Sequence, residues 1–272
     1  MKRTLLTLAL LATPVCAMAD KIDDLKAQGF VRIAIANEPP FTAVAADGTV
    51  SGAAPDVARE IFKRLGVPEV VASISEYGAM IPGLQAHRHD VITAGLFMKP
   101  ERCDAVAYSE PVLCDAESFL LPKGNPKGFK SFADIANDPT AKIGAPGGGT
   151  EEKLALDAGV PRDRVIVVPD GQSGVKMLQD GRIDVYSLPV LSISDLMKKA
   201  DDPNLEMFAP VEGAPVYCDG AAFNKDDTAL RDAFDVELAK MKESGEFAAI
   251  IEPYGFSAAA AKSTSRATLC GE

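Results

Sequence analysis

Side chains that suit ligand binding occur in two short segments of the first half of the chain. One reads Leu-Phe-Met-Lys-Pro-Glu-Arg-Cys-Asp and places Arg102 in a turn opened by a proline, shortly after Phe97. The other reads Asn-Glu-Pro-Pro-Phe and puts the carboxylate of Glu38 and the ring of Phe41 at the exit of an early strand. An arginine fork is a natural partner for a ligand carboxylate, and aromatic faces attract cations. Together these side chains predict a pocket for a small zwitterion.

The elements around these residues follow a repeated α/β pattern. Short β-branched runs alternate with helical patterns whose apolar residues fall on one face. In the first half we expect strands at 31–35, 70–74 and 91–94 and helices at 56–65 and 77–87. In the second half we expect strands at 142–145, 165–168 and 184–187, helices at 150–158 and about 174–179, and a flexible glycine turn at 147–149. Each half predicts a parallel sheet with helices on both faces.

Two similar α/β halves predict two lobes with a ligand cleft between them, because ligands of open parallel sheets lie at the carboxyl ends of the strands. Residues 119–121 and 221–223 resemble strands that connect the lobes. The expected organisation is a signal peptide at 1–19, lobe 1 at 20–118, lobe 2 at 119–221 with hinge strands at its ends, a return to lobe 1 at 222–257, and a tail at 258–272. We expect either a mobile tail or a strap that Cys270 fixes across lobe 1.

The amino terminus predicts export. Lys2 and Arg3 precede an apolar run, and Ala19 ends a stretch of small residues at a plausible cleavage site. This is the pattern of a secretory signal peptide, and the apolar run is too short for a membrane-spanning helix. We therefore expect cleavage near Ala19 and a mature protein in the periplasm.

The charge balance disfavours some partners. The chain has 39 acidic and 28 basic residues, with a formal net charge of −11. Such acidity disfavours nucleic acid and anionic lipid as partners. The sequence has neither a Cys-x-x-Cys pair nor a histidine beside a cysteine. We expect His87 and His89 at the surface, with no metal and no cofactor bound.

The cysteines after the predicted signal peptide are Cys103, Cys114, Cys218 and Cys270. An even number in an oxidising compartment predicts disulfides, and four cysteines allow three pairings. One pairing closes a short loop between Cys103 and Cys114 and ties the tail back through Cys218 and Cys270. The sequence favours structural disulfides and leaves the pairing open.

Four motifs in the same order resemble those of periplasmic solute-binding proteins that serve polar-amino-acid ABC importers. They are Glu38-Pro39-Pro40-Phe41, Gly52-Ala53-Ala54-Pro55-Asp56-Val57-Ala58, Lys99-Pro100-Glu101-Arg102 with Tyr108-Ser109-Glu110-Pro111, and Gly181-Arg182-Ile183-Asp184. The resemblance covers nearly the whole mature chain. It implies two α/β lobes that close on a ligand by hinge motion, and a membrane permease of an ABC importer as the partner. We expect a monomer without enzymatic activity.

The resemblance also suggests how the carboxylate end of the ligand is held. In the family, an arginine at the place of Arg102 grips the ligand carboxylate. A threonine at the start of a helix of lobe 2, here Thr150, assists with its hydroxyl and backbone amide, where the positive end of the helix favours an anion. Arg102 and Thr150 would then clamp the carboxylate from opposite lobes. Thr150 would otherwise be only a helix N-cap.

One departure from the family pattern points to an unusual ligand. Amino-acid binders commonly hold the α-ammonium group with an acidic residue at the place where this chain has Pro189. The cationic end is left with Glu38 and three aromatic residues, Phe41, Tyr77 and Phe97, which suit a diffuse cation. This arrangement is similar to that of ectoine- and hydroxyectoine-binding proteins, a branch of the family. The ring N–H groups of ectoine would explain an acceptor at Glu38.

Other interpretations stay open. The ligand is otherwise an amino acid, an opine or a betaine. Periplasmic cyclohexadienyl-type dehydratases resemble the same fold, and Glu38 would then be a general acid, but no histidine, lysine or second carboxylate can be placed beside it. Phe41 and Phe97 would otherwise be ordinary core residues. We expect Asp184 to be structural.

Overall fold

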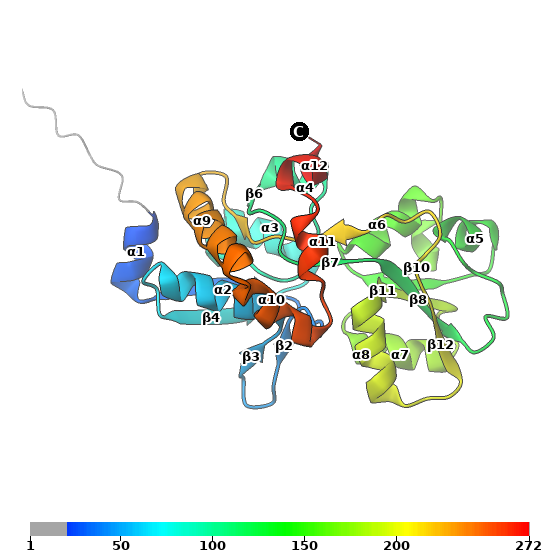
Figure 1. The fold of residues 1–272 in the computed structure, drawn as a ribbon. Coiled ribbons are helices and arrows are strands. Elements are labelled where there is room, and N and C mark those ends of the chain that lie inside the picture. Colours follow the sequence, from blue (N-terminus) through cyan, green and yellow to red (C-terminus); the bar gives the residue numbers. More distant parts are fainter. Residues whose placement is uncertain (1–20, 272) are drawn as a thin grey trace, which may run out of the picture.

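The computed structural model describes residues 21–271, which form two lobes, each built on a five-stranded sheet (Figure 1). The strands of lobe 1 are β1 (Phe30–Ile35), β4 (Glu69–Ile74), β5 (Val91–Ile92), β6 (Ala107–Tyr108) and β14 (Ala222–Phe223), in the order β4-β1-β5-β14-β6. The strands of lobe 2 are β8 (Glu117–Pro122), β9 (Ile143–Pro146), β10 (Val165–Val168), β11 (Val185–Pro189) and β12 (Leu205–Phe208), in the order β10-β9-β11-β8-β12.

Helices flank both sheets (Figure 1). Lobe 1 contains α1 (Lys21–Gln28), α2 (Ala53–Arg64), α3 (Tyr77–Gln85), α4 (Pro100–Ala105), α9 (Thr228–Ser244), α10 (Glu246–Ile251), the 3-10 helix η2 (Glu252–Tyr254), and the hairpin of β2 (Ala43–Val44) and β3 (Val50–Ser51). Lobe 2 contains α5 (Phe132–Asn137), α6 (Thr150–Asp157), η1 (Arg162–Arg164), α7 (Gly171–Gln179) and α8 (Val190–Ala200). Within residues 21–271 no helix is long and apolar enough to cross a membrane.

Each sheet is buried on both faces because its central strands are mostly apolar. In β1, Ile33 and Ile35 pack into one hydrophobic cluster, whereas Ala34 packs into another. In β8, Phe119 packs on one side and Leu120 on the other. Successive side chains of a strand point to opposite faces, so this division places a hydrophobic core above and below each sheet.

Both sheets are mixed, which corrects the expectation of purely parallel sheets. The strands joined by helices are parallel, as predicted: β1 pairs with β4 and β5, and β9 pairs with β10 and β11. However, β14 runs antiparallel to β5 and β6, and β8 runs antiparallel to β11 and β12. These two strands follow the passages of the chain between the lobes rather than a βαβ crossover, so no helix fixes them parallel.

The boundaries of some helices differ from the sequence-based expectation. The helix expected at 56–65 begins at Ala53, because Pro55 fits a first helical turn and Gly52, with a φ of 121°, turns the chain into it. The helix expected near 174 begins at Gly171, because the carboxylate of Asp170 accepts a hydrogen bond from the backbone N–H of Ser173. Both differences come from capping signals, which periodicity alone does not reveal.

The chain passes between the lobes next to a two-stranded sheet of β7 (Cys114–Asp115) and β13 (Tyr217–Cys218). The predicted connecting strands at 119–121 and 221–223 are therefore misplaced: the first lies within β8, and the second includes β14, which belongs to the sheet of lobe 1. Long apolar runs mark the buried strands beside the crossing, whereas β7 and β13 at the crossing itself are too short to contain such a run.

The four cysteines form two disulfides, as predicted, but the pairing with Cys103–Cys114 and Cys218–Cys270 is wrong. Cys114 pairs with Cys218 and Cys103 pairs with Cys270. Cys114 and Cys218 lie directly opposite each other in the β7–β13 ladder, with their Cα atoms 4.0 Å apart. This cross-strand neighbourhood joins residues far apart in the sequence, so spacing along the chain could not reveal it.

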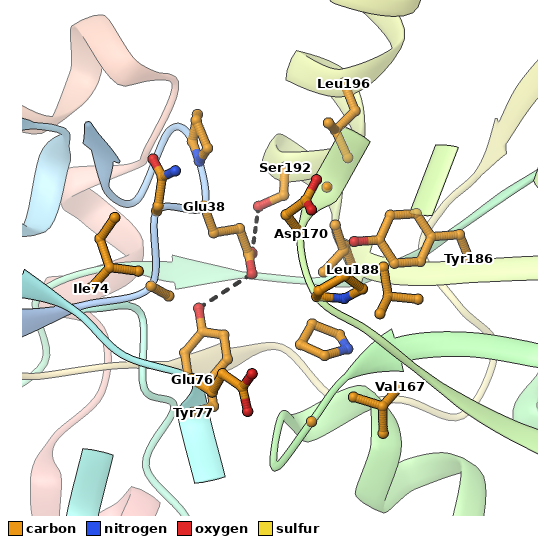
Figure 2. Close-up of a pocket in the computed structure, with 18 of the residues that line it drawn as sticks. Glu38, Ile74, Glu76, Tyr77, Val167, Asp170, Tyr186, Leu188, Ser192 and Leu196 are labelled. Atoms are coloured by element: carbon orange, nitrogen blue, oxygen red, sulfur yellow. Dashed lines mark hydrogen bonds between the residues drawn. The ribbon is translucent and has the colours of Figure 1, made fainter. Parts of the chain in front are cut away.

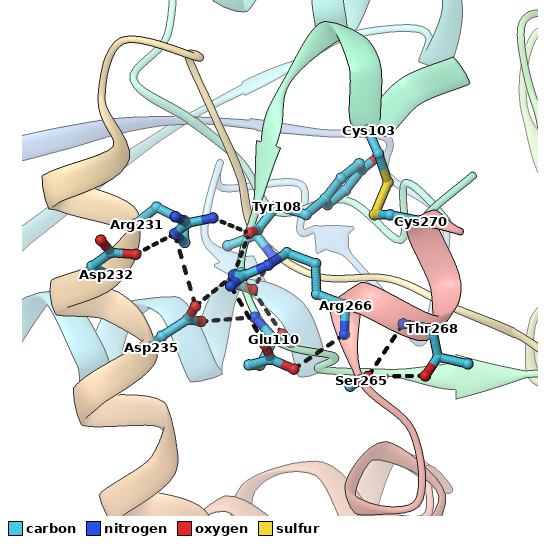
Figure 3. A network of polar contacts seen from close by, with 12 residues as sticks. Cys103, Tyr108, Glu110, Arg231, Asp232, Asp235, Ser265, Arg266, Thr268 and Cys270 are labelled. Atoms are coloured by element: carbon cyan, nitrogen blue, oxygen red, sulfur yellow. Dashed lines mark hydrogen bonds and ion pairs between the residues drawn. A yellow bond between two sulfur atoms is a disulfide. The ribbon is translucent and has the colours of Figure 1, made fainter. Parts of the chain in front are cut away.

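The carboxyl-terminal segment is a strap on lobe 1 over the residues described. It contains α11 (Ala258–Lys262) and α12 (Arg266–Cys270), and the Cys103–Cys270 disulfide joins α12 to α4 (Figure 3). Arg266 donates hydrogen bonds to Asp235 at 2.8 Å and to the carbonyl of Tyr108 at 2.9 Å (Figure 3). The predicted signal peptide at 1–19, with its cleavage site near Ala19, lies outside the described residues.

Candidate ligand-binding cleft

A pocket between the lobes brings together all six residues predicted for the ligand. Lobe 1 contributes Glu38, Phe41, Tyr77, Phe97 and Arg102, and lobe 2 contributes Thr150. The other lining residues are Gly95, Gly149, Glu151 and Pro189. We call this space the solute pocket. Its lobe 1 wall consists of loops and helix starts that follow β1, β4 and β5, the position expected for a site at the carboxyl ends of parallel strands.

The aromatic side chains form a continuous wall of the solute pocket. The rings of Phe41 and Phe97 meet edge to face with centroids 5.9 Å apart, and Phe97 also stacks on Tyr217 at 5.7 Å. Phe41 and Phe97 are only 1% and 3% exposed. Phe41 and Phe97 are therefore core residues and pocket residues at the same time. Their rings pack in the core of lobe 1 and also line the cleft.

Glu38 lies where the two lobes meet (Figure 2). Its carboxylate accepts a hydrogen bond of 2.7 Å from Ser192 of lobe 2 and one of 3.3 Å from the hydroxyl of Tyr77. Burial raises the pKa of Glu38 to about 8, and the nearby charge of Glu151 adds to the rise. A cation brought beside this carboxyl group would favour its ionised form.

Arg102 reaches across the cleft from α4. Its guanidinium donates to the carbonyl of Phe97 at 2.8 Å and to the carbonyl of Gly148, in the loop before α6, at 2.9 Å. Nearby, the N–H of Gly78 donates to the carbonyl of Gly147 at 3.2 Å. These bonds, together with Ser192–Glu38, hold the lobes in contact on both sides of the solute pocket.

Thr150 occupies the first position of α6, while Gly149 is the N-cap. The alternative in which Thr150 is the N-cap is therefore wrong. Thr150 is 3% exposed, and its hydroxyl oxygen has no hydrogen-bond partner among the described residues. A buried hydroxyl without a partner costs free energy, so a ligand oxygen accepting from it would be stabilising.

The sequence-based prediction missed two polar side chains of the cleft, Glu151 and Ser192. Glu151 is buried and lines the solute pocket, which supplies a second carboxylate although Pro189 stands where one was sought. Burial raises the pKa of Glu151, against the opposing effect of Lys99 and Arg102. The only sequence signal for Glu151 is the Thr-Glu-Glu segment at the start of α6. Acidic residues in a first helical turn are common, so this segment alone does not indicate a pocket residue. Ser192 belongs to no motif, and only the contact between the lobes identifies it.

Asp184 and the two histidines lie away from the solute pocket. Asp184 accepts from the backbone N–H of Lys142 at 2.8 Å and forms an ion pair of 2.9 Å with Lys127, so its role is structural, as expected. His87 is exposed, but the prediction of a surface position is wrong for His89, which is 5% exposed and contacts the carbonyl of Met80 at 2.9 Å. In the described part of the chain, no group of side chains has the arrangement of a metal site.

Comparison with known proteins agrees with this architecture. A curated relative, the probable amino-acid ABC transporter periplasmic-binding protein y4tE of Sinorhizobium fredii, is 34% identical over 92% of this chain and 84% of its own length. The crystal structure of EhuB in complex with hydroxyectoine is 83% identical, has a TM-score of 0.91, and is matched over 92% of this chain and 97% of that one. An arginine-binding protein from T. maritima is 26% identical, with a TM-score of 0.76 over 86% of this chain and 98% of its own.

The family assignment follows from the extent of these matches. The family model described as bacterial extracellular solute-binding proteins, family 3, matches residues 31–257, which include every residue of the solute pocket. With two α/β lobes around a cleft, this chain belongs to the bacterial extracellular solute-binding proteins of family 3.

Proposed function

We propose that this protein captures a small zwitterionic compatible solute, ectoine or hydroxyectoine, in the solute pocket and delivers it to the permease of an ABC importer. The main observation behind the proposal is that Arg102, the aromatic wall and Glu38 line one pocket between the lobes. The 83% identity to EhuB, whose structure was solved with hydroxyectoine, supports the same ligand class.

The chemistry of the pocket suggests how the ligand lies. Its carboxylate would sit between Arg102 and the start of α6, where the hydroxyl of Thr150 and the positive end of the helix dipole both favour an anion. Its delocalised ring cation would lie against Phe41 and Phe97, each face adding roughly 0.5 to 2 kcal/mol. The carboxylate of Glu38 would accept from the ring N–H groups.

Capture would proceed by closure of one lobe onto the other. The proposed hinge is the β7–β13 pair, where the chain passes between the lobes. A ligand shifts the equilibrium toward the closed form only through its differential affinity, which requires contacts from both lobes. Arg102 from one lobe and Thr150 from the other would meet this requirement. We further propose that the lobes divide at the β7–β13 pair, and we propose cleavage near Ala19, a periplasmic location and a monomeric protein.

An α-amino acid is the second candidate, and one observation favours it. Glu151 supplies the pocket with a second carboxylate besides Glu38, and this carboxylate is able to hold an α-ammonium group despite Pro189. The presence of Pro189 instead of an acidic residue therefore supports ectoine less strongly than the sequence suggested. The aromatic wall and the similarity to EhuB still favour the compact cyclic zwitterion.

We propose that the protein carries out no reaction. Glu38, with a pKa of about 8, has the protonation state of a general acid at neutral pH, which is the feature that a dehydratase would need. The family and EhuB, however, are binding proteins. Incubation with prephenate or arogenate, followed by chromatography of the products, tests this point; conversion above the buffer rate would contradict a pure binding function.

The decisive experiment is calorimetric titration of residues 20–272 with ectoine, hydroxyectoine, glycine betaine and a panel of amino acids. Calorimetry suits the chain because it contains no tryptophan to report closure. The protein is first unfolded and refolded to remove any ligand carried through purification. Tight binding of ectoine or hydroxyectoine with silent amino acids is expected. Binding of arginine or cystine alone would contradict the ligand while leaving the family assignment intact.

A further inference from the structure

Glu117 is a buried acidic residue that does not line the solute pocket. It opens β8, next to the passage between the lobes, and is 1% exposed. Neither of its carboxyl oxygens meets an N–H or O–H donor among the described residues. A buried carboxylate without a donor or a cation costs so much free energy that such groups are usually neutral or paired. The side chain therefore requires a proton, a cation or both.

The strand directs this side chain toward α6. Successive side chains of a strand alternate between its two faces. Phe119 and Leu121 share the face of Glu117, and both pack in the hydrophobic cluster that contains Ala155 of α6. Glu117 also lies opposite Pro189 in the β8–β11 ladder, and Pro189 lines the solute pocket. The carboxyl group is therefore placed behind the wall of the pocket, on the side of α6.

The first turn of α6 carries Glu151, whose carboxyl group lies within hydrogen-bonding reach of Glu117. Glu151 is 4% exposed and lines the solute pocket. Its carboxyl group folds back over Gly149, since a Cβ added there would lie 2.7 Å from its Oε2. Ionised carboxylates are acceptors only, so two of them attract each other only when one holds a proton. The contact therefore requires a proton between Glu117 and Glu151.

The surrounding charges favour this proton on Glu117. Burial, and then the charge of Glu151, raise the pKa of Glu117 well above its usual range, and the charge of Glu38 adds to the rise. Burial raises the pKa of Glu151 too, but its own backbone N–H, Lys99 and Arg102 lower it. Glu117 is then the donor, and Glu151 is the carboxylate that accepts.

The remaining negative charge has a counter-charge on lobe 1. Lys99, the N-cap of α4, is 7% exposed, and its ammonium group lies 5.3 Å from the ring centroid of Tyr217. The charge of this lysine interacts favourably with those of Glu151 and Glu117. The two carboxyl groups with one proton, together with Lys99, are electrically neutral. Neutrality lowers the cost of burying the pair when the lobes come together.

We propose that Glu117 is a positioning residue for the solute pocket: as a neutral carboxylic acid it donates a hydrogen bond to Glu151 and holds that carboxylate against the ligand. Glu151 then serves, in addition to Glu38, as a fixed acceptor for a cationic N–H group of the bound zwitterion. Without this donor, the carboxylate of Glu151 turns toward Arg102 and neutralises the cation that the ligand carboxylate needs. This role rests on the proposed function, because Glu117 acts on the ligand only through Glu151.

Three single variants test the donor by calorimetric titration with ectoine. Glu117→Gln keeps a donor in its amide N–H, so it is expected to bind within about threefold of the unchanged protein. Glu117→Leu keeps a similar volume without a donor, and is expected to bind about tenfold more weakly. Ser118→Ala is the matched control, because it removes a buried hydroxyl from the same strand, one that donates to the carbonyl of Leu188 at 2.8 Å. It should lower Tm and leave ectoine affinity unchanged.

A double-mutant cycle shows whether Glu117 acts through Glu151. Glu151→Gln is itself expected to weaken ectoine binding about tenfold, because the fixed acceptor loses its charge. Adding Glu117→Leu to it should change the affinity by about twofold at most, since the carboxylate to be positioned is already gone. Independent, additive losses would overturn the positioning role. Equal weakening by Glu117→Gln and Glu117→Leu, or by Ser118→Ala, would do so as well.

The proton can be detected without a ligand, which separates this role from the proposed function. At neutral pH, the infrared difference spectrum between the unchanged protein and Glu117→Gln should contain the C=O stretch of a protonated carboxyl group. Absence of this band would overturn the inference whether or not ectoine binds. If the band is present but ectoine does not bind, the proposed ligand is wrong while the Glu117–Glu151 pair stands. The cycle is then measured with the member of the amino-acid and betaine panel that binds, with the same expected result.

Discussion

At the scale of single residues, the solute pocket combines one arginine, acidic side chains and aromatic rings. Arg102 and Glu38 lie in the same pocket without pairing with each other, because Arg102 donates to carbonyl groups and Glu38 accepts from hydroxyls. Backbone carbonyls neutralise no charge, so Arg102 keeps its attraction for a carboxylate. A zwitterion is the ligand that satisfies both ends at once.

Truncation of these side chains should therefore affect ligand affinity unequally. Arg102→Ala is expected to abolish binding, since it removes the only cation among the lining residues of the solute pocket. Phe97→Ala is expected to weaken binding ten- to hundredfold, or roughly 1.4 kcal/mol for each factor of ten. His87→Ala, at an exposed position away from the pocket, is the control and should change nothing. Calorimetry measures all three variants; unchanged affinity in both pocket variants would show that the pocket is misplaced.

Glu38 should make binding depend on pH. Its pKa of about 8 in the free protein means that the group is largely protonated at pH 7, whereas a bound cation favours the carboxylate. Binding at pH 7 should then release a proton, and affinity should rise by up to tenfold per pH unit from pH 6 to 8 and level off above. Calorimetry in two buffers of different ionisation enthalpy measures the released proton. Equal heats in both buffers would contradict the prediction.

The stability of the ligand-free protein should respond to pH in the opposite sense. The folded-state pKa of Glu38 lies above the ordinary value of 4.5, so the folded state holds the proton more tightly than the unfolded state. This contribution to stability is fully present below about pH 4.5 and declines as pH rises toward 8. The amide of Glu38→Gln stays neutral at all these pH values. The Tm of this variant should therefore fall less between pH 6 and pH 8 than the Tm of the unchanged protein, as measured by thermal unfolding.

Residue types predicted much of this site, and the limits have physical causes. Glu38, Phe41, Phe97 and Arg102 could be found because each lies in a short motif beside a strand end. Ser192 could not, since a serine on a helix has no distinguishing pattern until the opposite lobe is placed against it. Contacts between the lobes depend on the whole fold, which no local pattern encodes.

At the scale of elements, α4 is unusual because it presents Arg102 but has little packing of its own. None of its residues is fully buried. Its position is fixed instead by the disulfide from Cys103 to Cys270 and by Lys225, whose amino group donates to the carbonyl of Cys103. The carboxyl-terminal strap thus supports the helix that carries the proposed anion anchor.

Loss of this disulfide should weaken ligand binding as well as stability. The Cys103→Ser/Cys270→Ser variant is expected to bind ectoine about tenfold more weakly, because α4 no longer holds Arg102 in one position. Cys114→Ser/Cys218→Ser is the comparison for stability: its disulfide joins residues 104 positions apart instead of 167, which is a similar entropic effect, but it lies in the proposed hinge and does not touch α4. Both variants should lower Tm. Unchanged ectoine affinity of Cys103→Ser/Cys270→Ser, at a temperature at which this variant stays folded, would show that the strap does not position Arg102.

The strands and helices themselves were predictable to different degrees. Strong apolar periodicity located β1, β10 and α2, whereas the two-residue strands β7 and β13 are too short to carry a period. The antiparallel direction of β8 and β14 in their sheets could not be predicted either, because it follows from where the chain crosses between the lobes. Local sequence therefore predicts the repeated α/β units well and their junctions poorly.

At the scale of the whole molecule, function depends on how closely the two lobes approach each other. The hydrogen bond between Gly78 and Gly147 joins a helix start of lobe 1 to a loop of lobe 2. At this place Gly148, with a φ of 73°, lies so near that a Cβ added to it would be 2.4 Å from the Cα of Gly78. Backbone cannot move aside as a flexible side chain can, so closure requires glycine at position 148.

Gly148→Ala should therefore leave each lobe folded but keep the cleft from closing fully. We expect at least a tenfold loss of ectoine affinity, and a smaller ligand-induced decrease in the radius of gyration measured by small-angle X-ray scattering. Gly181→Ala is the control, because Gly181 has a similar φ of 67° but no atom lies within 4 Å of its added Cβ. Both substitutions strain the backbone alike, and only the first creates a clash between lobes. If Gly181→Ala reduces affinity and compaction as much as Gly148→Ala does, backbone strain is the cause, and the contact between Gly148 and Gly78 does not limit closure.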